Sequence, residues 1–179
     1  MEPFYIREAT PEDALELIEY LKEVGGQSDY LTFGPEGLPV TPQAEAEMLE
    51  HKHKEAGSVI YLAHRAGKLI GMGSLDRMPR RMSHRSELGL TVLRQEWNKG
   101  VGTALMAQLL HYAKNNGIEL IYLETAQENQ PAIHLYEKFG FRKVGCWPAF
   151  FKLGNRYLDF VGMVLDLRPE LYDKAMKEE

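Results

Sequence analysis

Cysteine, export signals and long apolar runs are scarce or missing in this sequence of 179 residues. Its one cysteine, Cys146, has no partner for an internal disulfide, which suits the reducing cytosol. Residues 1–7 lack the basic-then-apolar pattern of a secretory signal, and no apolar stretch is long enough to span a bilayer. We therefore expect a soluble, cytoplasmic protein with no membrane partner.

An excess of positive charge is missing as well. The formal net charge is −5, so nothing offsets the repulsion of a nucleic-acid backbone, and we expect no nucleic-acid partner. One basic cluster lies at residues 77–85, in a segment that also holds Pro79. A solvated hairpin tip explains this cluster better than a nucleic-acid patch does.

Metal ligands at a chelating spacing are also absent from the sequence. His51 and His53 fall on a predicted helix, where residues two apart point to different faces and cannot hold one ion. Cys146 has no histidine or cationic neighbour in sequence, so we expect it to pack rather than react. We therefore predict no metal site.

What is present is the composition of an ordinary globular domain. Hydrophobic residues make up 44% and charged residues 26%, values that argue against disorder. The chain shows no repeat, linker or low-complexity tract, and its length fits one hydrophobic core. We expect a single domain over residues 1–179.

The order of elements follows from periodicity and turn residues. The predicted elements are strands over residues 4–7, 58–64, 68–75, 86–93, 118–123, 141–148 and 156–166, and helices that begin at Thr10, Thr41, Gly100 and residue 130. This order predicts an α+β domain, in which an antiparallel meander precedes a β-α-β-α passage with a parallel pairing.

Several details of these elements are predicted too. Thr10 caps the first helix with Asp13 three residues later, and the second helix ends at Gly57. Residues 27–41 form a long loop of the kind that often serves as a functional lid. The apolar run at 118–123 predicts a strand covered on both faces. The residues expected to form the buried stripe of the first helix are Leu15, Leu17, Ile18 and Leu21.

Residues 98–105, which read N-K-G-V-G-T-A-L, carry the strongest chemical signal. They follow an apolar strand and open an amphipathic helix, so free backbone N–H groups and the positive end of the helix dipole converge there. Such a glycine turn is weak evidence alone, because this spacing occurs by chance. A second segment, residues 128–141, reads E-N-Q-P-A-I-H-L-Y-E-K-F-G-F. Together the two segments predict that a phosphate-bearing cofactor is bound and used.

The two segments resemble the signature motifs of the GNAT superfamily of acyl-CoA-dependent N-acetyltransferases. Gly100 and Gly102 occupy the glycine places of the motif Arg/Gln-x-x-Gly-x-Gly/Ala, and the run from Asn129 to Phe141 is similar to the second signature. Trp97 stands where arginine or glutamine is usual, a departure that concerns one cofactor contact and not the backbone cradle. The resemblance covers nearly the whole chain.

This resemblance implies a GNAT-like fold, with a mixed, mostly antiparallel, twisted sheet of about seven strands and about four flanking helices. It implies acetyl-CoA as co-substrate, with its pantetheine arm between splayed parallel strands at 88–93 and 118–125 and its pyrophosphate on the helix start. A backbone N–H near Val92 is expected to stabilise the acetyl oxyanion. The implied cofactor residues are Val92, Leu93, Lys99, Gly100, Val101, Gly102, Thr103, Asn129 and Lys138.

Two residues are expected to move protons. Tyr136 resembles the family's general acid, which protonates the leaving thiolate, although a half-buried helical tyrosine is the structural alternative. Glu87 begins the strand before the glycine turn, where some family members place a base; the alternative is an exposed strand carboxylate. An ammonium acceptor must lose a proton before it attacks, so a proton acceptor is chemically required. The resemblance implies direct attack without an acyl-enzyme.

The acceptor amine is expected between the loop after the first helix and the last hairpin. The candidate residues there are Asp29, Tyr30, Phe33, Trp147 and Phe150. Their aromatic rings suit a small amine with an apolar part, and Asp29 or Glu87 would hold its ammonium. Alternatively, the aromatics close the core or form a homodimer contact. We expect transfer to a small primary amine such as an amino acid.

Other functions stay open from the sequence. The resemblance also includes acetyltransferases of protein amino termini, such as those of ribosomal proteins. A non-catalytic acyl-CoA sensor would share the fold, although Tyr136 argues for an enzyme. A nucleotide-binding oxidoreductase would use the glycine turn with Glu124, but Leu105 takes the place of the third glycine.

Overall fold

Seven strands and four α-helices make up residues 2–168, the part of the chain that the computed structural model describes. The strands are β1 (Phe4–Glu8), β2 (Val59–Arg65), β3 (Lys68–Arg77), β4 (Arg85–Val92), β5 (Leu120–Ala126), β6 (Arg142–Leu153) and β7 (Arg156–Asp166). The helices are α1 (Ala14–Gly25), α2 (Pro42–Lys54), α3 (Val101–Asn115) and α4 (Gln130–Lys138). The ends of the expected domain, residue 1 and residues 169–179, lie outside the described residues. None of the described helices is both long and apolar enough to cross a membrane.

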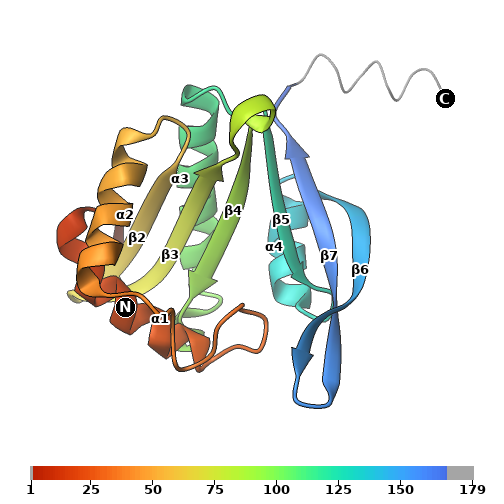
Figure 1. Ribbon diagram of the computed structural model, residues 1–179, viewed down its shortest axis with the longest axis horizontal. Coiled ribbons are helices and arrows are strands. Elements are labelled where there is room, and N and C mark those ends of the chain that lie inside the picture. Colours follow the sequence, from red (N-terminus) through yellow and green to blue (C-terminus); the bar gives the residue numbers. More distant parts are fainter. Residues whose placement is uncertain (1, 169–179) are drawn as a thin grey trace.

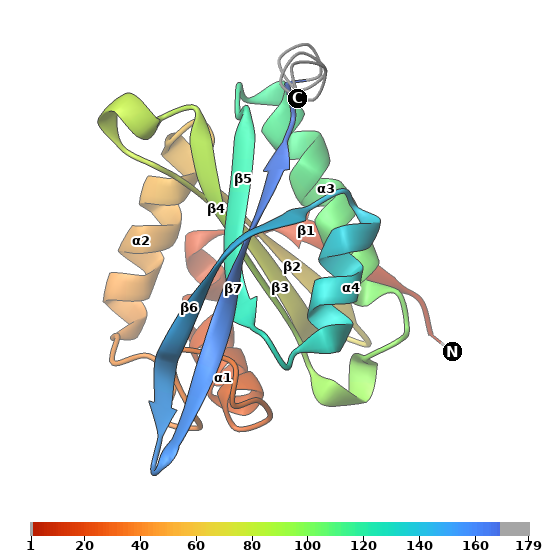
Figure 2. The ribbon, with the colours of Figure 1, turned by 90° about the vertical axis from the view of Figure 1, so that its right-hand side faces the viewer.

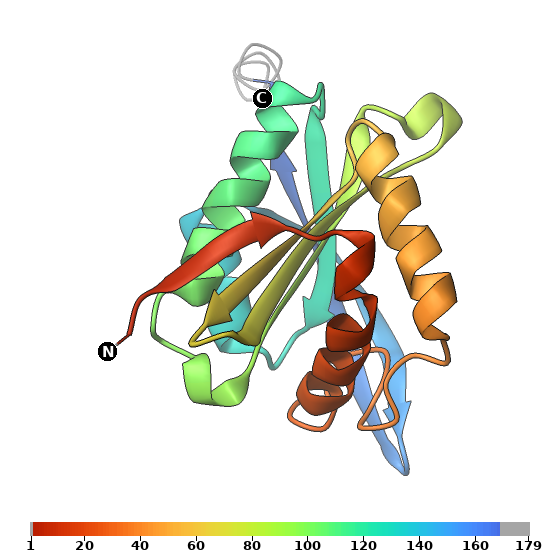
Figure 3. The same ribbon diagram turned by 90° about the vertical axis from the view of Figure 1, so that its left-hand side faces the viewer.

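One sheet holds all seven strands, in the order β1-β2-β3-β4-β5-β7-β6. Neighbouring strands are antiparallel except β4 and β5, which run parallel because α3 carries the chain back between them. Helices α1 and α2 cover one face of the sheet, and α3 and α4 cover the other (Figures 2 and 3). The predicted α+β architecture, with a meander and one parallel pair, is confirmed.

The parallel strands β4 and β5 separate soon after they meet. Their pairing covers three positions, from Arg85 opposite Leu120 to Glu87 opposite Tyr122. On their outer sides both strands stay paired, β4 with β3 and β5 with β7. The inner edges therefore diverge and open a wedge in the sheet, which Figure 1 shows between the two labelled strands.

Helix α3 lies close against the sheet because two glycines of β3 leave room for it. An added Cβ would come within 2.9 Å of Val101 at Gly71, and within 2.9 Å of Leu109 at Gly73. Val101, Leu105 and Leu109 are almost completely buried, which confirms the predicted apolar face of this helix. This contact fixes the start of α3, and with it the glycine turn, beside β4.

Helix α1 buries the predicted apolar stripe except for its first residue. Leu17, Ile18 and Leu21 are buried as expected, and Val24 is buried with them. Leu15 was expected in the stripe, but its side chain is 61% exposed. This part of the prediction was wrong, because Leu15 lies two positions from Leu17 and so points to solvent.

Strand β5 is not covered on both faces, as its apolar run had predicted. Burial alternates along most of the strand, and the exposed Glu124 borders an open cavity. The ends of two other elements also differ from the prediction. Helix α2 ends at Lys54 rather than Gly57, and β6 continues to Leu153, beyond residue 148.

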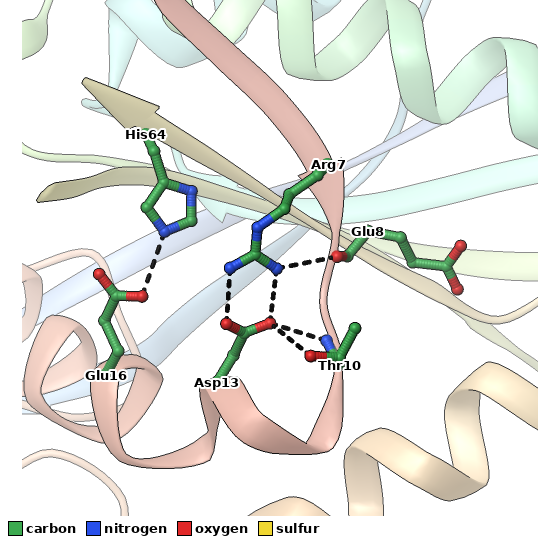
Figure 4. Close-up of polar contacts among 6 residues, drawn as sticks. All are labelled: Arg7, Glu8, Thr10, Asp13, Glu16 and His64. Carbon is green, nitrogen blue, oxygen red and sulfur yellow. Dashed lines mark hydrogen bonds and ion pairs between the residues drawn. The ribbon is translucent and has the colours of Figure 1, made fainter. Parts of the chain in front are cut away.

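A charged contact joins the first strand to the first helix (Figure 4). Arg7 of β1 donates hydrogen bonds to both carboxylate oxygens of Asp13, at 2.7 and 2.6 Å. Asp13 also accepts from the backbone N–H of Thr10 at 2.8 Å, which completes the predicted capping box. The hydrogen bonds from Arg7 lower the pKa of Asp13 to about 2. Nearby, Nε2 of His64 lies 3.1 Å from Glu16 and links β2 to α1.

We predict that Asp13→Asn lowers the free energy of unfolding near pH 7 by about 1–2 kcal/mol, since Arg7 is partly exposed and the pair is screened. The folded pKa of Asp13 lies below its unfolded value, so the stabilisation is present above about pH 4 and disappears as the pH falls toward about 2. Urea unfolding across this range measures the difference, with Glu12→Gln as a control in the same turn. A difference that stays constant down to pH 2 would contradict the assignment.

Candidate active site

A cavity of about 1020 Å³ occupies the wedge between β4 and β5. Its walls come from α1, α2, the start of α3, α4, the loop after α1 and the tip of the β6–β7 hairpin. The loop and the hairpin tip lie at the open end of the wedge (Figures 1 and 2). Because these elements are far apart in sequence, the fold as a whole shapes this site.

The turn before α3 leaves an uncapped helix start at the edge of the cavity. Asn98 and Gly100 have φ values of 60° and 83°, a left-handed conformation that asparagine and glycine tolerate best. Among the described residues, no side chain caps α3, and Ala104 N–H donates to Gly100 O. The N–H groups of residues 101–103 therefore point out of the helix end beside the cavity. This arrangement suits a phosphate or another anion.

The inner edge of β4 presents backbone groups to the same cavity. Leu93 N–H donates to Ile70 O of β3 at 3.0 Å, so the alternation of an antiparallel ladder turns Val92 away from β3. The N–H and C=O groups of Val92, and by the same alternation those of Leu90, face the gap. The indole N–H of Trp97 donates to the Val92 carbonyl at 2.8 Å. The N–H of Val92 faces the cavity.

Trp97 replaces an expected arginine or glutamine with an aromatic face. Its side chain is 48% exposed, and the Arg94 guanidinium lies 5.7 Å from its ring centre. Both residues line the cavity. Arg94 thus places a positive charge at the cavity three residues before position 97.

Tyr136 of α4 contributes a buried hydroxyl to the cavity. The residue is 7% exposed, and its ring packs against Phe141 with centres 5.8 Å apart. No hydrogen-bond partner for the hydroxyl is found among the described residues. Burial raises the pKa of Tyr136 to about 12, so the phenol is protonated at neutral pH. The hydroxyl is therefore free to donate to a group that enters the cavity.

The remaining predicted cofactor residues differ in their placement. Asn129 lines the cavity, where its amide donates to the hydroxyl of Thr125 at 3.3 Å and does not cap α4. Leu93 is fully buried behind β4, and Lys99 and Lys138 do not line the cavity. The structure thus brings together the helix start, Val92 and Asn129, with both lysines outside the cavity.

Most of the predicted acceptor residues lie at the cavity, namely Asp29, Tyr30, Phe33 and Phe150. Phe150 stacks on Phe151 with ring centres 5.8 Å apart and lies 5.0 Å from Phe160. Trp147 is placed elsewhere, because its indole covers Gly162 so closely that an added Cβ would overlap the ring. The rings at the hairpin tip thus wall the cavity, while Trp147 packs on β7.

Two carboxylates lie where β4 and β5 begin to separate. Glu87 accepts a hydrogen bond from the Tyr122 hydroxyl at 3.0 Å. Burial, and then the Glu87 carboxylate, raise the pKa of Tyr122 to about 12. Glu124, two residues along β5, lines the cavity as well, and burial together with Glu87 raises its pKa. Glu124 therefore holds a proton more readily than an isolated glutamate does.

Sequence reasoning missed several charged residues of this cavity, namely Glu45, Lys52, Asp76 and the role of Glu124 at the site. Lys52 of α2 forms an ion pair with Asp76 of β3, and Asp76 lies opposite Glu87 in the sheet. The seven-residue spacing of Glu45 and Lys52 would have placed them on one helix face. That face could not be assigned to a cavity without the packing of α2 on the sheet.

Comparison with known proteins gives a family and a shared architecture. Residues 16–141 match the model of the acetyltransferase (GNAT) family. The crystal structure of an acetyltransferase of the GNAT family from Streptococcus pneumoniae superposes with a TM-score of 0.89 at 26% identity. The match covers 92% of this chain and 100% of that one.

Curated relatives match over shorter stretches. An N-alpha-acetyltransferase of Sulfolobus acidocaldarius is 33% identical over 112 residues, which are 57% of this chain and 67% of that protein. An L-amino acid N-acetyltransferase of Escherichia coli, AaaT, is 30% identical over 95 residues, 52% of this chain and 59% of that protein. The chain thus spans about half to two thirds of the length of the curated relatives it matches.

We predict that Gly102→Val weakens the binding of coenzyme A by about tenfold or more. A Cβ at this position comes within 3.3 Å of Leu135, and the two methyl groups of valine would crowd the N–H groups of the helix start. Isothermal titration calorimetry measures the affinity. Gly145→Val on the exposed strand β6 is the matched control and should bind normally. Unchanged affinity in a folded Gly102→Val protein would remove the helix start from the site.

Proposed function

This chain belongs to the GNAT family of acetyltransferases, and from this premise we propose that it transfers an acetyl group from acetyl-CoA to the primary amine of a small molecule by direct attack. As a family member it is an acyltransferase. The observation that carries the finer proposal is the meeting of three groups at one cavity. An anion-binding helix start, a buried phenol and a pair of carboxylates suit the donor's phosphates, its sulfur and the acceptor's ammonium.

The residues of the wedge fit coenzyme A. The N–H groups of residues 101–103 would hold the pyrophosphate, with Arg94 adding positive charge. The backbone N–H and C=O groups of Leu90 would bond the amides of the pantetheine arm, in place of a neighbouring strand. When bound, acetyl-CoA supplies an acetyl group activated as a thioester. The N–H of Val92 then serves as a donor to the acetyl oxygen.

Tyr136 is proposed as the proton donor to the departing sulfur. Its raised pKa keeps the proton on the phenol at neutral pH, and its hydroxyl has no competing partner among the described residues. Burial against Phe141 holds the ring in place. The leaving thiolate is a much stronger base than water, so it can accept the proton of such a phenol. Without this proton the negative charge of the thiolate would form in a site with little solvent.

Glu87 is proposed as the acceptor of the proton that the acceptor's ammonium must lose. It is exposed to the cavity, held by Tyr122, and close enough to Glu124 to affect the pKa of that residue. Two neighbouring carboxylates attract an ammonium, and Glu87 then serves as the general base that accepts its proton. The nitrogen loses two protons in each turnover. Glu87 accepts the first and passes it to solvent, and the second, released as the amide forms, replaces the proton that Tyr136 gives to the thiolate.

The lining of the cavity favours a small acceptor over a polypeptide. The loop after α1 brings Tyr30 and Phe33 to the cavity, and the hairpin tip brings Phe150 and Phe151. These rings wall the site on the side opposite the helix start, as in pockets for small ligands. The names of the relatives do not decide the question, since one acts on amino acids and another is an N-alpha-acetyltransferase.

We predict that Tyr136→Phe lowers kcat by about a hundredfold, because it removes a proton donor used only in the transition state. The affinity for coenzyme A should change by about twofold at most, since the ring stays packed. Steady-state kinetics and calorimetry separate the two effects. Tyr157→Phe, at an exposed position of the β6–β7 hairpin, is the control. Full activity in Tyr136→Phe would exclude this residue as the acid.

We further predict that thiol release from acetyl-CoA depends on a small amine. A panel of amino acids, polyamines, aminoglycosides and ribosomal-protein peptides tests the class of acceptor, and mass spectrometry tests for an acetylated protein. Turnover of peptides with no small amine would establish the N-terminal acetyltransferase instead. Binding of acetyl-CoA without any turnover would favour a sensor, and an isolable acetyl-enzyme would contradict direct attack.

A further inference from the structure

The acceptor side of the cavity carries more negative charge than transfer to a simple amine requires. Four carboxylates and one ammonium line it, from α2, β3, β4 and β5. They are Glu45, Asp76, Glu87, Glu124 and Lys52. Together these five groups carry a formal charge of −3, and Asp29 of the loop after α1 adds a further negative charge at the cavity.

These groups share one face of the sheet. Asp76 lies directly opposite Glu87 in the β3–β4 ladder, so their side chains point to the same side. Tyr122 reaches Glu87 across the β4–β5 pair, and Glu124, two residues further, shares its face. The ion pair between Lys52 and Asp76 brings α2 onto this face. The charges therefore form one cluster.

Glu45 is the member of the cluster whose carboxylate has no partner within residues 2–168. The residue is 4% exposed and lines the cavity, yet within residues 2–168 its carboxylate forms neither a hydrogen bond nor an ion pair. Its charged neighbour is Lys52, two turns along α2. Burial raises the pKa of Glu45. The carboxylate of this largely buried side chain opens onto the cavity without a partner, and a cationic ligand in the cavity would stabilise it.

The cations of the cavity are already engaged. The Lys52 side chain is 17% exposed and paired with Asp76. Arg94 follows β4 at the cofactor side, where it donates to the Gln27 carbonyl and lies over Trp97. A free amino acid would bring its carboxylate into a negative cluster, with no uncommitted cation in the described lining. This argues against the amino acid expected from the sequence.

We propose that the acceptor is a dication, a diamine or a longer polyamine, whose reacting amine lies beside Glu87 and Glu124 and whose second ammonium binds at Glu45. This rests on the proposed acetyl transfer. Met48 of α2 and Met72 of β3 line the cavity and offer apolar contact to the methylene chain.

The charge of the cluster also favours release of the product. Transfer replaces an N–H bond of the amine by an N–C bond to the acetyl group, and the resulting amide is neutral. The product keeps one ammonium where the substrate had two, so it binds the negative cluster more weakly. The acetylated product of a monoamine carries no ammonium. A monoamine substrate has one ammonium, at the reacting end, and would leave Glu45 unpaired.

Three acceptors of equal length test the proposal: 1,5-diaminopentane, pentylamine and 5-aminopentanoate, with the four- and six-carbon diamines to cover the spacing. With saturating acetyl-CoA, kcat/KM for the diamine should exceed that for pentylamine by about tenfold or more, and 5-aminopentanoate should be poorest. Glu45→Gln should lower kcat/KM for the diamine about tenfold more than it lowers kcat/KM for pentylamine. Glu50→Gln, exposed on the same helix, should change neither. Thermal melting of Glu45→Gln, expected at or above the wild-type Tm, confirms the fold.

Calorimetry of the same amines with the protein saturated in coenzyme A gives an outcome that does not need turnover. Diamine binding that is selective and lost in Glu45→Gln supports the proposal. Equal binding of the three compounds overturns it, and equal kcat/KM values overturn it while leaving acetyl transfer intact. Selective diamine binding without any acetylation supports the dication site and contradicts the proposed function.

Discussion

The separation of β4 from β5 after three paired positions is the constraint on which the site depends. Backbone N–H and C=O groups inside a protein need hydrogen-bond partners, and two strands that diverge lose theirs on the inner edges. The chain supplies one partner itself, since Trp97 donates to the Val92 carbonyl. The N–H of Val92 faces the cavity, ready for a ligand that carries amide groups. The binding site thus exists because β4 and β5 stop pairing and leave backbone groups of β4 unpaired.

Two electrostatic environments lie along this one cavity. At the start of α3, uncapped N–H groups, the helix dipole and Arg94 favour negative charge. Toward α2, the cluster around Glu45 and Glu87 favours positive charge. Tyr136 contributes a neutral proton donor to the same cavity, because burial keeps its phenol protonated. A polyanionic donor and a cationic acceptor would therefore each find a complementary part of the cavity.

Local sequence predicted the features of the fold and of the site that lie within one turn, strand or helix. The glycine turn at Gly100, the apolar face of α3 and the capping box at Thr10 each depend on residues a few positions apart, and the structure confirms them. The sequence did not predict several other residues that only tertiary packing brings to the cavity or away from it. Glu45 lies at the cluster only because α2 packs across the sheet. Trp147 lies away from the cavity because Gly162, which has no side chain, leaves room for the indole on β7. Periodicity says which side chains share a face, but tertiary contacts decide what that face meets.

The central claim is that the inner edge of β4 pairs with coenzyme A. Amide hydrogen exchange, followed residue by residue by NMR, tests it most directly. We predict that acetyl-CoA slows exchange at the N–H groups of Leu90, Val92 and the start of α3, and leaves those of β4 residues already paired with β5 unchanged. Acetyl-CoA that binds without slowing exchange at Leu90 and Val92 would contradict the account.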